Sequence, residues 1–292
     1  MPLATTREML AHALQHHYAI GAYNMHNMEE LLAIVDAAEE ERAPVIVQVT
    51  PDAIRYAGLE VAAAMVKAAA GAASVPVALH IDHGTDFDVN MRAFRAGFTS
   101  LMYDGHALPF EENVHISKNI VDVAHLAGVP VEAELGAVGH ASDNLSREQI
   151  IELMTDPDKA KEFVELTGVD ALAVACGSVH SMTAKTCEMD IDRVKAIHKR
   201  LPQTPLVIHG SSGVVEETLL AAIPYGIAKI NVYTWVAQGF LQGLREGVAD
   251  SAGPADPRKT LALSREYSKE RVIYKMRLFG TSGRIDSSGG YV

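Results

Sequence analysis

Cysteine is scarce in this chain, and its scarcity excludes two classes of protein. The 292 residues include only Cys176 and Cys187. Two cysteines fit neither the disulfide framework of a small secreted protein nor a cysteine-rich zinc site. We therefore expect both thiols to be reduced, with Cys176 a small buried apolar group, in a cytoplasmic protein.

Long hydrophobic runs are also missing. The longest candidate, residues 61–79, is rich in alanine and is interrupted by Lys67, so we do not expect it to cross a membrane. The first eight residues lack the basic and then apolar order of a secretory signal. Both observations favour a cytoplasmic protein that has no membrane partner.

Basic residues are in the minority. Lysine and arginine number 25 against 37 aspartates and glutamates, which gives a net charge of −12, and no basic patch stands out. Phosphate backbones would be repelled, so nucleic acid is excluded as a partner. A small anion can still bind where local donors or a metal ion attract it. Hydrophobic residues make up 48% of the chain, which is enough for a large core.

The sequence is rich in apolar strand-like runs that alternate with amphipathic helical segments. Helical periodicity is clear in residues 28–42 and 110–126, and Asn27 and Ser146 stand at cap positions before helical segments. The spacing of the runs is roughly that of a βα unit. The eight strand-like runs are residues 18–24, 44–50, 75–82, 98–104, 131–136, 170–176, 205–210 and 228–232.

Eight strands that alternate with helices in one chain favour a (β/α)8 TIM barrel of the α/β class over an open sheet. The first run is not followed by the Gly-x-Gly-x-x-Gly turn of a dinucleotide-binding fold. We expect one barrel domain over residues 1–285, with a C-terminal helical extension at 260–277 after a Gly/Pro turn at 252–257. A disordered tail is expected at 286–292, and the polar stretch 138–158 is the best candidate for a mobile loop over the mouth.

Polar residues gather where the predicted strands end. The third run closes on His80, Asp82 and His83 just before Gly84. Because adjacent strand residues point to opposite faces, His80 and Asp82 share one face, and His83 faces the other unless the strand has already begun to turn. In a closed barrel the carboxyl ends of all strands meet at one mouth, where such proteins keep their chemistry.

Three histidines come from the ends of three different predicted strands, namely His83, His180 and His209. A single histidine is more often a hydrogen-bonded structural residue, and we interpret His12 and His198, on helical segments, in that way. Three histidines at one barrel mouth are harder to dismiss. They predict a zinc site that leaves one position open for substrate.

Carboxylates accompany these histidines. Beside a metal ion, Asp82 is better interpreted as a proton carrier than as a helix cap, because a general acid or base must lie within reach of the reacting oxygen. Asp104 and Glu134 stand at the ends of the fourth and fifth runs. They could equally be hydrogen-bond partners of the histidines, which metal sites usually require.

Small and hydroxyl-bearing residues follow the last two runs. They let backbone N–H groups approach an anion, and the N-terminus of a following helix adds a favourable field. A Gly/Ser turn alone is weak evidence, but barrel enzymes often bind phosphate after strands seven and eight. The residues are Gly210, Ser211, Ser212 and Gly213 after the seventh run, and Asn231, Tyr233 and Thr234 at the end of the eighth.

With these residues in place, the chain resembles the class II, zinc-dependent ketose-bisphosphate aldolases, nearest to the tagatose-bisphosphate aldolase branch. The similarity covers residues 11–284, and its motifs together are specific to the family. They are Ala-Tyr-Asn at 22–24, Pro-Val-Ala-Leu-His-Ile-Asp-His-Gly at 76–84, Gly-Phe-Thr-Ser-Leu-Met-Tyr-Asp-Gly at 97–105, Leu-Pro-Phe-Glu-Glu-Asn at 108–113, Val-Glu-Ala-Glu-Leu-Gly at 131–136, His-Gly-Ser-Ser-Gly at 209–213 and Arg-Leu-Phe-Gly at 277–280.

The resemblance implies a set of roles. It implies Zn²⁺ on the three histidines, proton transfer by Asp82, and a possible second mono- or divalent cation at Asp104 and Glu134. A homodimer or homotetramer is also implied, with the long C-terminal helix as an interface. The residues expected to contact a small phosphorylated ketose are Asn24, Thr50, Ser181, Gly210, Ser211, Ser212, Asn231, Tyr233 and Thr234.

Three positions near the expected substrate depart from the family pattern. Ser142 stands where a loop glutamate is expected to assist proton transfer, Ser181 where a glycine usually follows the second zinc histidine, and Tyr233 where Asp or Ala is frequent. The loop 182–189 lacks the usual Tyr-Lys pair and has only Lys185 nearby. These departures concern the substrate more than the fold or the metal.

The leading hypothesis is reversible aldol cleavage of a phosphorylated ketose, such as tagatose or fructose 1,6-bisphosphate, to dihydroxyacetone phosphate and an aldehyde. In it, zinc polarises the C2 carbonyl and stabilises the enediolate, while Asp82 takes the proton of the C4 hydroxyl. One alternative is the same chemistry with a different or smaller aldehyde, which the departures motivate. Another is a non-catalytic sugar-phosphate- or metal-binding subunit, against which the retention of Asp82 and three histidines argues.

Overall fold

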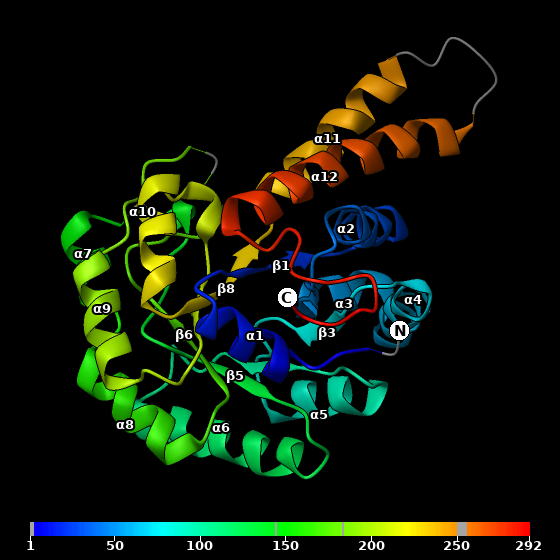
Figure 1. Ribbon diagram of the computed structural model, residues 1–292. Helices are drawn as coiled ribbons and strands as arrows, with labels where there is room; N and C mark the ends of the chain where they lie inside the picture. The colour runs from blue at the N-terminus through cyan, green and yellow to red at the C-terminus, as the bar shows by residue number, and fades with distance from the viewer. Residues whose placement is uncertain (1–2, 144, 183, 250–255) are drawn as a thin grey trace.

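Eight parallel strands form the centre of the molecule (Figure 1). The computed structural model describes residues 3–143, 145–182, 184–249 and 256–292. Each strand coincides with one of the eight predicted runs, and only β8 begins one residue earlier. The strands are β1 (Ile20–Asn24), β2 (Val45–Val49), β3 (Val77–Ile81), β4 (Leu101–Tyr103), β5 (Val131–Leu135), β6 (Ala171–Val174), β7 (Leu206–Ile208) and β8 (Ile227–Val232).

The strands are arranged as a barrel. Hydrogen-bonded neighbours follow the order β3-β2-β1-β8-β7-β6-β5-β4, and every pair is parallel. Isolated parallel bridges from His80 to Ser100 and from Gly84 to Tyr103 join the two outer strands of that order. The prediction of a (β/α)8 TIM barrel is therefore confirmed.

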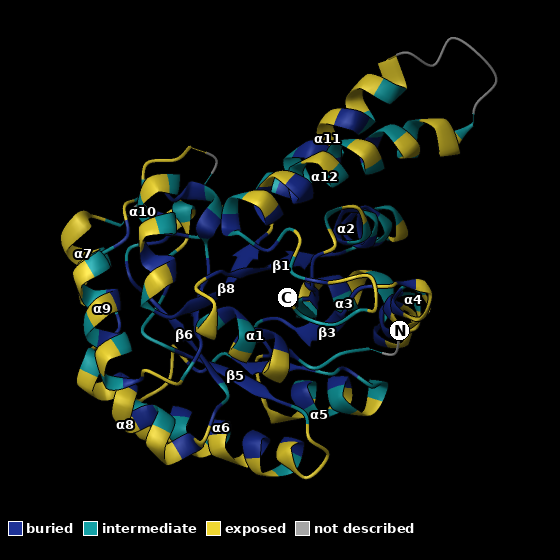
Figure 2. Cartoon of the chain, in the orientation of Figure 1, coloured by how far each residue is buried: buried dark blue, intermediate teal, exposed yellow. Residues whose placement is uncertain are grey.

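Helices surround the barrel, and most of them turn a buried side inward and an exposed side to solvent (Figure 2). The predicted caps are present, since the Asn27 side chain accepts from Glu30 N, and Ser146 forms a capping box with Gln149. The helices are α1 (Thr6–Gln15), α2 (Met28–Glu41), α3 (Pro51–Ala57), α4 (Leu59–Ala72), α5 (Phe87–Ala96), α6 (Phe110–His125), α7 (Arg147–Leu153), α8 (Pro157–Thr167), α9 (Ile191–Arg200), α10 (Glu216–Ala222), α11 (Thr234–Ala249) and α12 (Pro257–Phe279), with short 3-10 turns η1 (Ala141–Asp143), η2 (Ser211–Gly213) and η3 (Ile223–Tyr225).

One end of the barrel is closed by α1. Its Met9, Leu10 and Ala13 form one apolar cluster with inward-facing strand residues such as Ile20 and Ile46. Burying these side chains against the strand interior stabilises the closed end by the hydrophobic effect. The carboxyl ends of the strands, on the opposite side, are left for chemistry.

The C-terminal helices α11 and α12 lie side by side and project away from the barrel (Figure 1). The predicted extension is present, although α12 begins at Pro257, three residues before the predicted start. The predicted turn at 252–257 falls mostly outside the described residues. None of the helices in the described part of the chain is long and apolar enough to span a membrane.

The tail differs from the disordered segment that we expected at 286–292. Ile285 and Tyr291 form an antiparallel bridge, and the Asp286 side chain accepts from Ser288 N and Gly290 N. The Tyr291 ring also lies 4.6 Å from the His12 ring, so local hydrogen bonds and aromatic contact order these residues.

The predicted loop at 138–158 contains η1 and α7, and its mobility stays a prediction. The single-domain division at residue 285 also stays a prediction.

Candidate active site

A cavity of about 750 Å³ lies at the carboxyl ends of the strands. Its wall includes every predicted site residue except His209 and Gly213, which are buried. The predicted residues that line it are Asn24, Thr50, Asp82, His83, Asp104, Glu134, His180, Ser181, Gly210, Ser211, Ser212, Asn231, Tyr233 and Thr234. Residues that are far apart in the sequence thus meet in one place.

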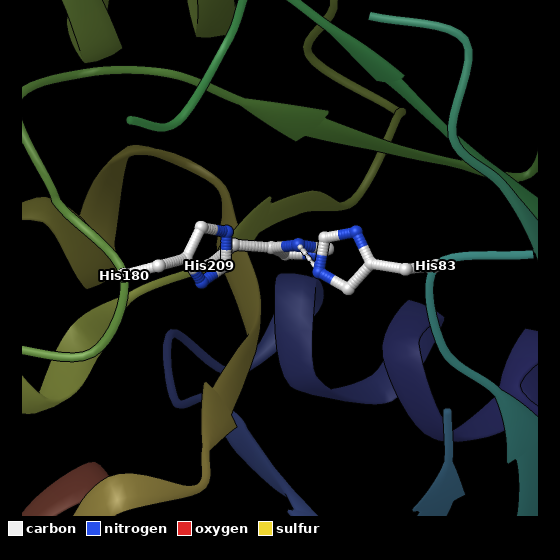
Figure 3. Close-up of side chains that lie close together, drawn as sticks. All are labelled: His83, His180 and His209. Atoms are coloured by element: carbon white, nitrogen blue, oxygen red, sulfur yellow. Dashed lines mark hydrogen bonds between the residues drawn. The ribbon is translucent and has the colours of Figure 1, made fainter. Parts of the chain in front are cut away.

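The three histidines from separate strand ends turn their rings toward one another (Figure 3). The ring of His83 lies 4.6 Å from that of His209 and 5.3 Å from that of His180, and the last two rings are 6.0 Å apart. One nitrogen from each ring lies within 4.8 Å of the other two. Three nitrogens at this separation can share one metal ion.

His83 reaches the cluster because the chain has already turned. β3 ends at Ile81, and His83 adopts a left-handed φ of +51°. This conformation is uncommon for residues other than glycine, and such residues are enriched at active sites. Asp82 and His83 therefore both line the cavity instead of facing opposite sides of a regular strand.

Carboxylates hold the outer nitrogens of two of the histidines. His83 Nδ1 lies 2.7 Å from Asp104 Oδ2, and His209 Nε2 lies 3.0 Å from Glu132 Oε1. Their other nitrogens, His83 Nε2 and His209 Nδ1, face each other at 3.1 Å. Metal-binding histidines commonly donate one N–H to a carboxylate and present the second nitrogen to the ion. The donor set of this chain therefore fits a metal ion.

The pKa values of the cluster are shifted in both directions. Burial, with the neighbouring His209 and His83, lowers the pKa of His180 to about 3. Burial, followed by His83 and Lys229, also holds the pKa of His209 well below its usual range. Burial alone would lower the pKa of His83, but Asp82 and Asp104 raise it to about 10. Metal binding at His83 would release a proton, because only a neutral imidazole nitrogen can be a ligand.

Asp82 is held by two amides at the cavity wall. Asn24 Nδ2 donates to Oδ2 at 3.2 Å and Asn231 Nδ2 donates to Oδ1 at 3.0 Å, while only 3% of the residue is exposed. Its Oδ1 lies 3.9 Å from His83 Nε2. The carboxylate is therefore fixed beside the histidine cluster, where it can exchange a proton with a bound molecule.

A second group of potential ligands consists of His83, Asp104 and Glu134. Burial, with the nearby Asp104, raises the pKa of Glu134 to about 8. His106, which the sequence reasoning missed, lies with its Nδ1 2.5 Å from Asp104 Oδ1. Its hydrogen bond to Asp104 raises the pKa of His106. Its position in the sequence, two residues after the predicted ligand Asp104, could have identified His106 as a site residue.

The predicted phosphate loop lies at the end of β7. Gly210 has a φ of +65°, and a Cβ there would lie 2.8 Å from the carbonyl carbon of Val179, so a side chain would not fit. The Ser211 hydroxyl donates to the Asn231 carbonyl at 2.5 Å, which ties this loop to the end of β8. The 16-residue helix α11 begins at Thr234 on the same wall, and helix N-termini attract anions.

The three departures lie around the cavity. Ser181 adopts a φ of +60°, a conformation that explains why glycine suits this position. Tyr233 is 47% exposed, and its ring lies 5.2 Å from that of His26. His140, two residues before Ser142, lines the cavity and stacks on His180 at 5.0 Å. His26 and His140 were not predicted, and no local pattern separated them from structural histidines.

The fold and the site define a TIM-barrel protein with a histidine cluster and a small-residue anion loop at one mouth. The family described as class-II fructose-bisphosphate aldolase matches residues 4–284. The chain belongs to this family. Its members are metal-dependent lyases that act on phosphorylated sugars.

Individual relatives agree with this assignment. A "probable fructose-bisphosphate aldolase" of Bacillus subtilis is 43% identical over 287 residues, covering 97% of this chain and 100% of that protein. A fructose-bisphosphate aldolase of Geobacillus stearothermophilus is 42% identical, covering 97% and 99%. The crystal structure of the YdjI aldolase of Escherichia coli has a TM-score of 0.84 and 36% identity, covering 96% and 98%. None of these three names refers to the tagatose branch.

Proposed function

We propose that this protein catalyses the reversible aldol cleavage of a ketose bisphosphate to dihydroxyacetone phosphate and an aldehyde. The observation that carries the proposal is the meeting of His83, His180, His209 and Asp82 with the loop at Gly210 in one cavity. Family membership supports the reaction class. We assign separate roles to the residues on the cavity wall.

We propose Zn²⁺ as the metal, held by His83, His180 and His209. A divalent cation at this position supplies a Lewis acid for the carbonyl group of the substrate. Asp104 and Glu132 support the site by fixing the orientation of two of the rings, since each lies within hydrogen-bond distance of an outer ring nitrogen. Asp104 and Glu134 are proposed to hold a second mono- or divalent cation.

Asp82 is proposed to carry the proton of the C4 hydroxyl. It takes this proton when the C3–C4 bond breaks, and returns it to the aldehyde oxygen in the condensation direction. The two amide donors on its carboxylate support this role because they hold both oxygens in place beside the histidines. A fixed acid or base avoids the cost of ordering it during the reaction.

The phosphate of the dihydroxyacetone half is proposed to bind at Gly210, Ser212 and Thr234. Backbone N–H groups of η2, hydroxyl groups and the N-terminus of α11 supply neutral donors there. Ser211 contributes through its backbone. Asn231 links this loop to Asp82, since its carbonyl accepts from Ser211 and its amide donates to Asp82. Asn24, Thr50, Ser181 and Tyr233 also line the cavity and are proposed to contact the rest of the substrate.

The departures favour a different or smaller aldehyde as a second candidate substrate. The exposed Tyr233 ring, packed near His26, occupies space on the cavity wall that a smaller residue would leave open.

We also propose that the protein is cytoplasmic and forms a homodimer or homotetramer through the projecting helices α11 and α12. Both proposals are separate from the reaction itself.

A panel of phosphorylated ketoses tests the reaction. Release of dihydroxyacetone phosphate is measured with the purified protein, after treatment with a chelator, and after restoring Zn²⁺. We expect release from at least one ketose, its loss with the chelator, and its return with zinc. If no ketose releases dihydroxyacetone phosphate while one still binds, the protein is a sugar-phosphate-binding subunit instead.

A further inference from the structure

Lys229 is a buried lysine to which the proposed reaction assigns no role. It lies on β8, with 0% of the residue exposed. A lysine is rarely buried unless its ammonium group is paired. Here Nζ lies 2.9 Å from Glu132 Oε2 and 2.8 Å from Asn231 Oδ1.

Each partner of Lys229 leads to a different part of the candidate site. Glu132 uses its other oxygen to hold the Nε2 atom of His209 at 3.0 Å. Asn231 uses its amide nitrogen to donate to Asp82 at 3.0 Å. The ammonium group is therefore linked through Glu132 to His209, a proposed metal ligand, and through Asn231 to Asp82, the proposed proton carrier.

The chemistry of the ammonium group determines which way the Asn231 amide faces. An asparagine side chain has an acceptor oxygen and a donor nitrogen, which exchange places by a half-turn. Lys229 can only donate, so the amide oxygen must face it, and the NH2 group must then face Asp82. After a half-turn, donors would meet at Lys229 and acceptors would meet at Asp82.

The other amide on Asp82 is less restricted. Asn24 donates to Asp82, and its oxygen accepts from Gln48 Nε2 at 2.7 Å. Gln48 is itself an amide, and its Oε1 has no hydrogen-bond partner among the described residues. A half-turn of both amides would keep the bond between them. The Asp82 carboxylate favours the NH2-facing orientation of both amides, but only Asn231 has a second neighbour, the donor-only Lys229, that enforces this orientation independently of Asp82.

We propose that Lys229 is a positioning residue, which fixes the Asn231 amide with its NH2 group toward Asp82 while it holds Glu132 against His209. This inference rests on the proposed role of Asp82 in proton transfer. The proposal gives the Lys229 side chain two separate roles. Neutralising the buried Glu132 is a structural task, whereas orienting Asn231 serves turnover.

A double variant separates the two tasks. Lys229→Met with Glu132→Gln removes both charges, so no buried charge is left unpaired, and the glutamine still offers an oxygen to His209. We expect the thermal midpoint, the bound zinc and the KM for the best ketose phosphate to stay close to the parent values. We expect kcat to fall about 10- to 100-fold, because the Asn231 amide is free to turn.

A comparison with Asn231→Ala shows whether the effect passes through that residue. If it does, adding the double variant to Asn231→Ala lowers kcat no further, because the orientation of a missing amide no longer matters. Losses that multiply would overturn the proposal, as would a double variant with kcat within about three-fold of the parent. A normal rate for Asp82→Asn would show that Asp82 is not the proton carrier and would overturn this inference with it, whereas failure of the parent protein to release dihydroxyacetone phosphate from any ketose would overturn the proposed function.

Lys229→Gln is a second variant that tests the positioning role if the double variant does not fold. This side chain still has a donor, but it also has an acceptor, so it tolerates either orientation of Asn231. Normal zinc content with the same fall in kcat would support the positioning role. Normal zinc content with parental kcat would show that the role of Lys229 is structural.

Discussion

At the scale of residues, the site depends on which atom of each side chain is already engaged. Asp104 and Glu132 occupy the outer nitrogens of His83 and His209, so the inner nitrogens face each other. The amides of Asn24 and Asn231 engage both oxygens of Asp82. Two predictions follow from these contacts, one for the metal and one for the proton.

Replacing His83, His180 or His209 by alanine should abolish tight zinc binding and activity. Each change leaves only two of the three imidazole ligands in the cluster. Zinc content by elemental analysis and dihydroxyacetone phosphate release measure the two effects. His115→Ala, an exposed histidine on α6, is the control and should bind zinc normally. Full zinc occupancy in two of the three cluster variants would contradict the site.

Asp82→Asn should separate binding from chemistry. The amide keeps the shape of the side chain but cannot take up a proton, so kcat should fall by about 10²- to 10⁴-fold. Zinc content and ketose phosphate binding should stay near the parental values, as measured by elemental analysis and calorimetry. A rate within a few-fold of the parent would assign the proton to another group.

At the scale of elements, α10 and α12 are joined by one carboxylate. Glu216, the first residue of α10, accepts from Lys185 at 2.6 Å, from Lys275 at 2.9 Å and from the Tyr274 hydroxyl at 2.7 Å. Lys275 is only 1% exposed. The C-terminal helix is thus tied to the barrel through a buried cation that needs this partner.

Glu216→Gln should lower the free energy of unfolding by about 2 kcal/mol at pH 7, because it leaves the Lys275 ammonium without a counter-charge. Urea unfolding followed by circular dichroism measures the change. Glu217→Gln removes the same charge from the exposed neighbouring position and is the control, expected to change stability little. Equal stability of both variants would show that the ion pair contributes nothing.

The contribution of Glu216 should also depend on pH. Burial would raise its pKa, but hydrogen bonds from Lys185, Tyr274 and Lys275 lower it to about 2. A folded pKa below the unfolded value of about 4.3 means that the stabilisation is complete above that value. It is lost as the pH falls from about 4 toward about 2. The difference between parent and Glu216→Gln should therefore narrow below about pH 4 in the same unfolding experiment.

At the scale of the whole molecule, one cavity brings together the anion loop and the positions that depart from the family pattern. The loop at Gly210, the start of α11 and Tyr233 all line it, as does Asp143 of the η1 turn that contains Ser142. If the departures concern only the aldehyde, the dihydroxyacetone half should react normally. The protein should then exchange the carbon-bound proton of dihydroxyacetone phosphate with solvent yet cleave fructose and tagatose bisphosphates poorly.

Tyr233→Ala with Ser142→Glu should raise kcat/KM for those two bisphosphates by about 10-fold relative to the best other substrate. The change adds room on the wall and restores a loop carboxylate. Rates of dihydroxyacetone phosphate release give the ratio, with Tyr56→Ala, an exposed tyrosine outside the cavity wall, as the control. Efficient cleavage of either bisphosphate by the unmodified protein would show that the departures are neutral.

The sequence by itself determined the eight strands and the position of the site. Buried parallel strands read as continuous apolar runs, so their ends are visible in the sequence. Because all these ends meet at one mouth, Asp82, His83, His180 and His209 could be predicted to lie together without coordinates. The helix caps at Asn27 and Ser146 were equally local signals, and they were present as predicted.

Only the tertiary structure decided which side chains pair. Whether Glu132 or Glu134 holds His209, whether His83 turns into the mouth, and which way Asn231 faces depend on the register of strands that are distant in the sequence. The order of the tail depends on the contact of Tyr291 with His12, from opposite ends of the chain. Local patterns carry no information about such contacts, because side-chain pairing is set by barrel closure and not by the neighbouring residues.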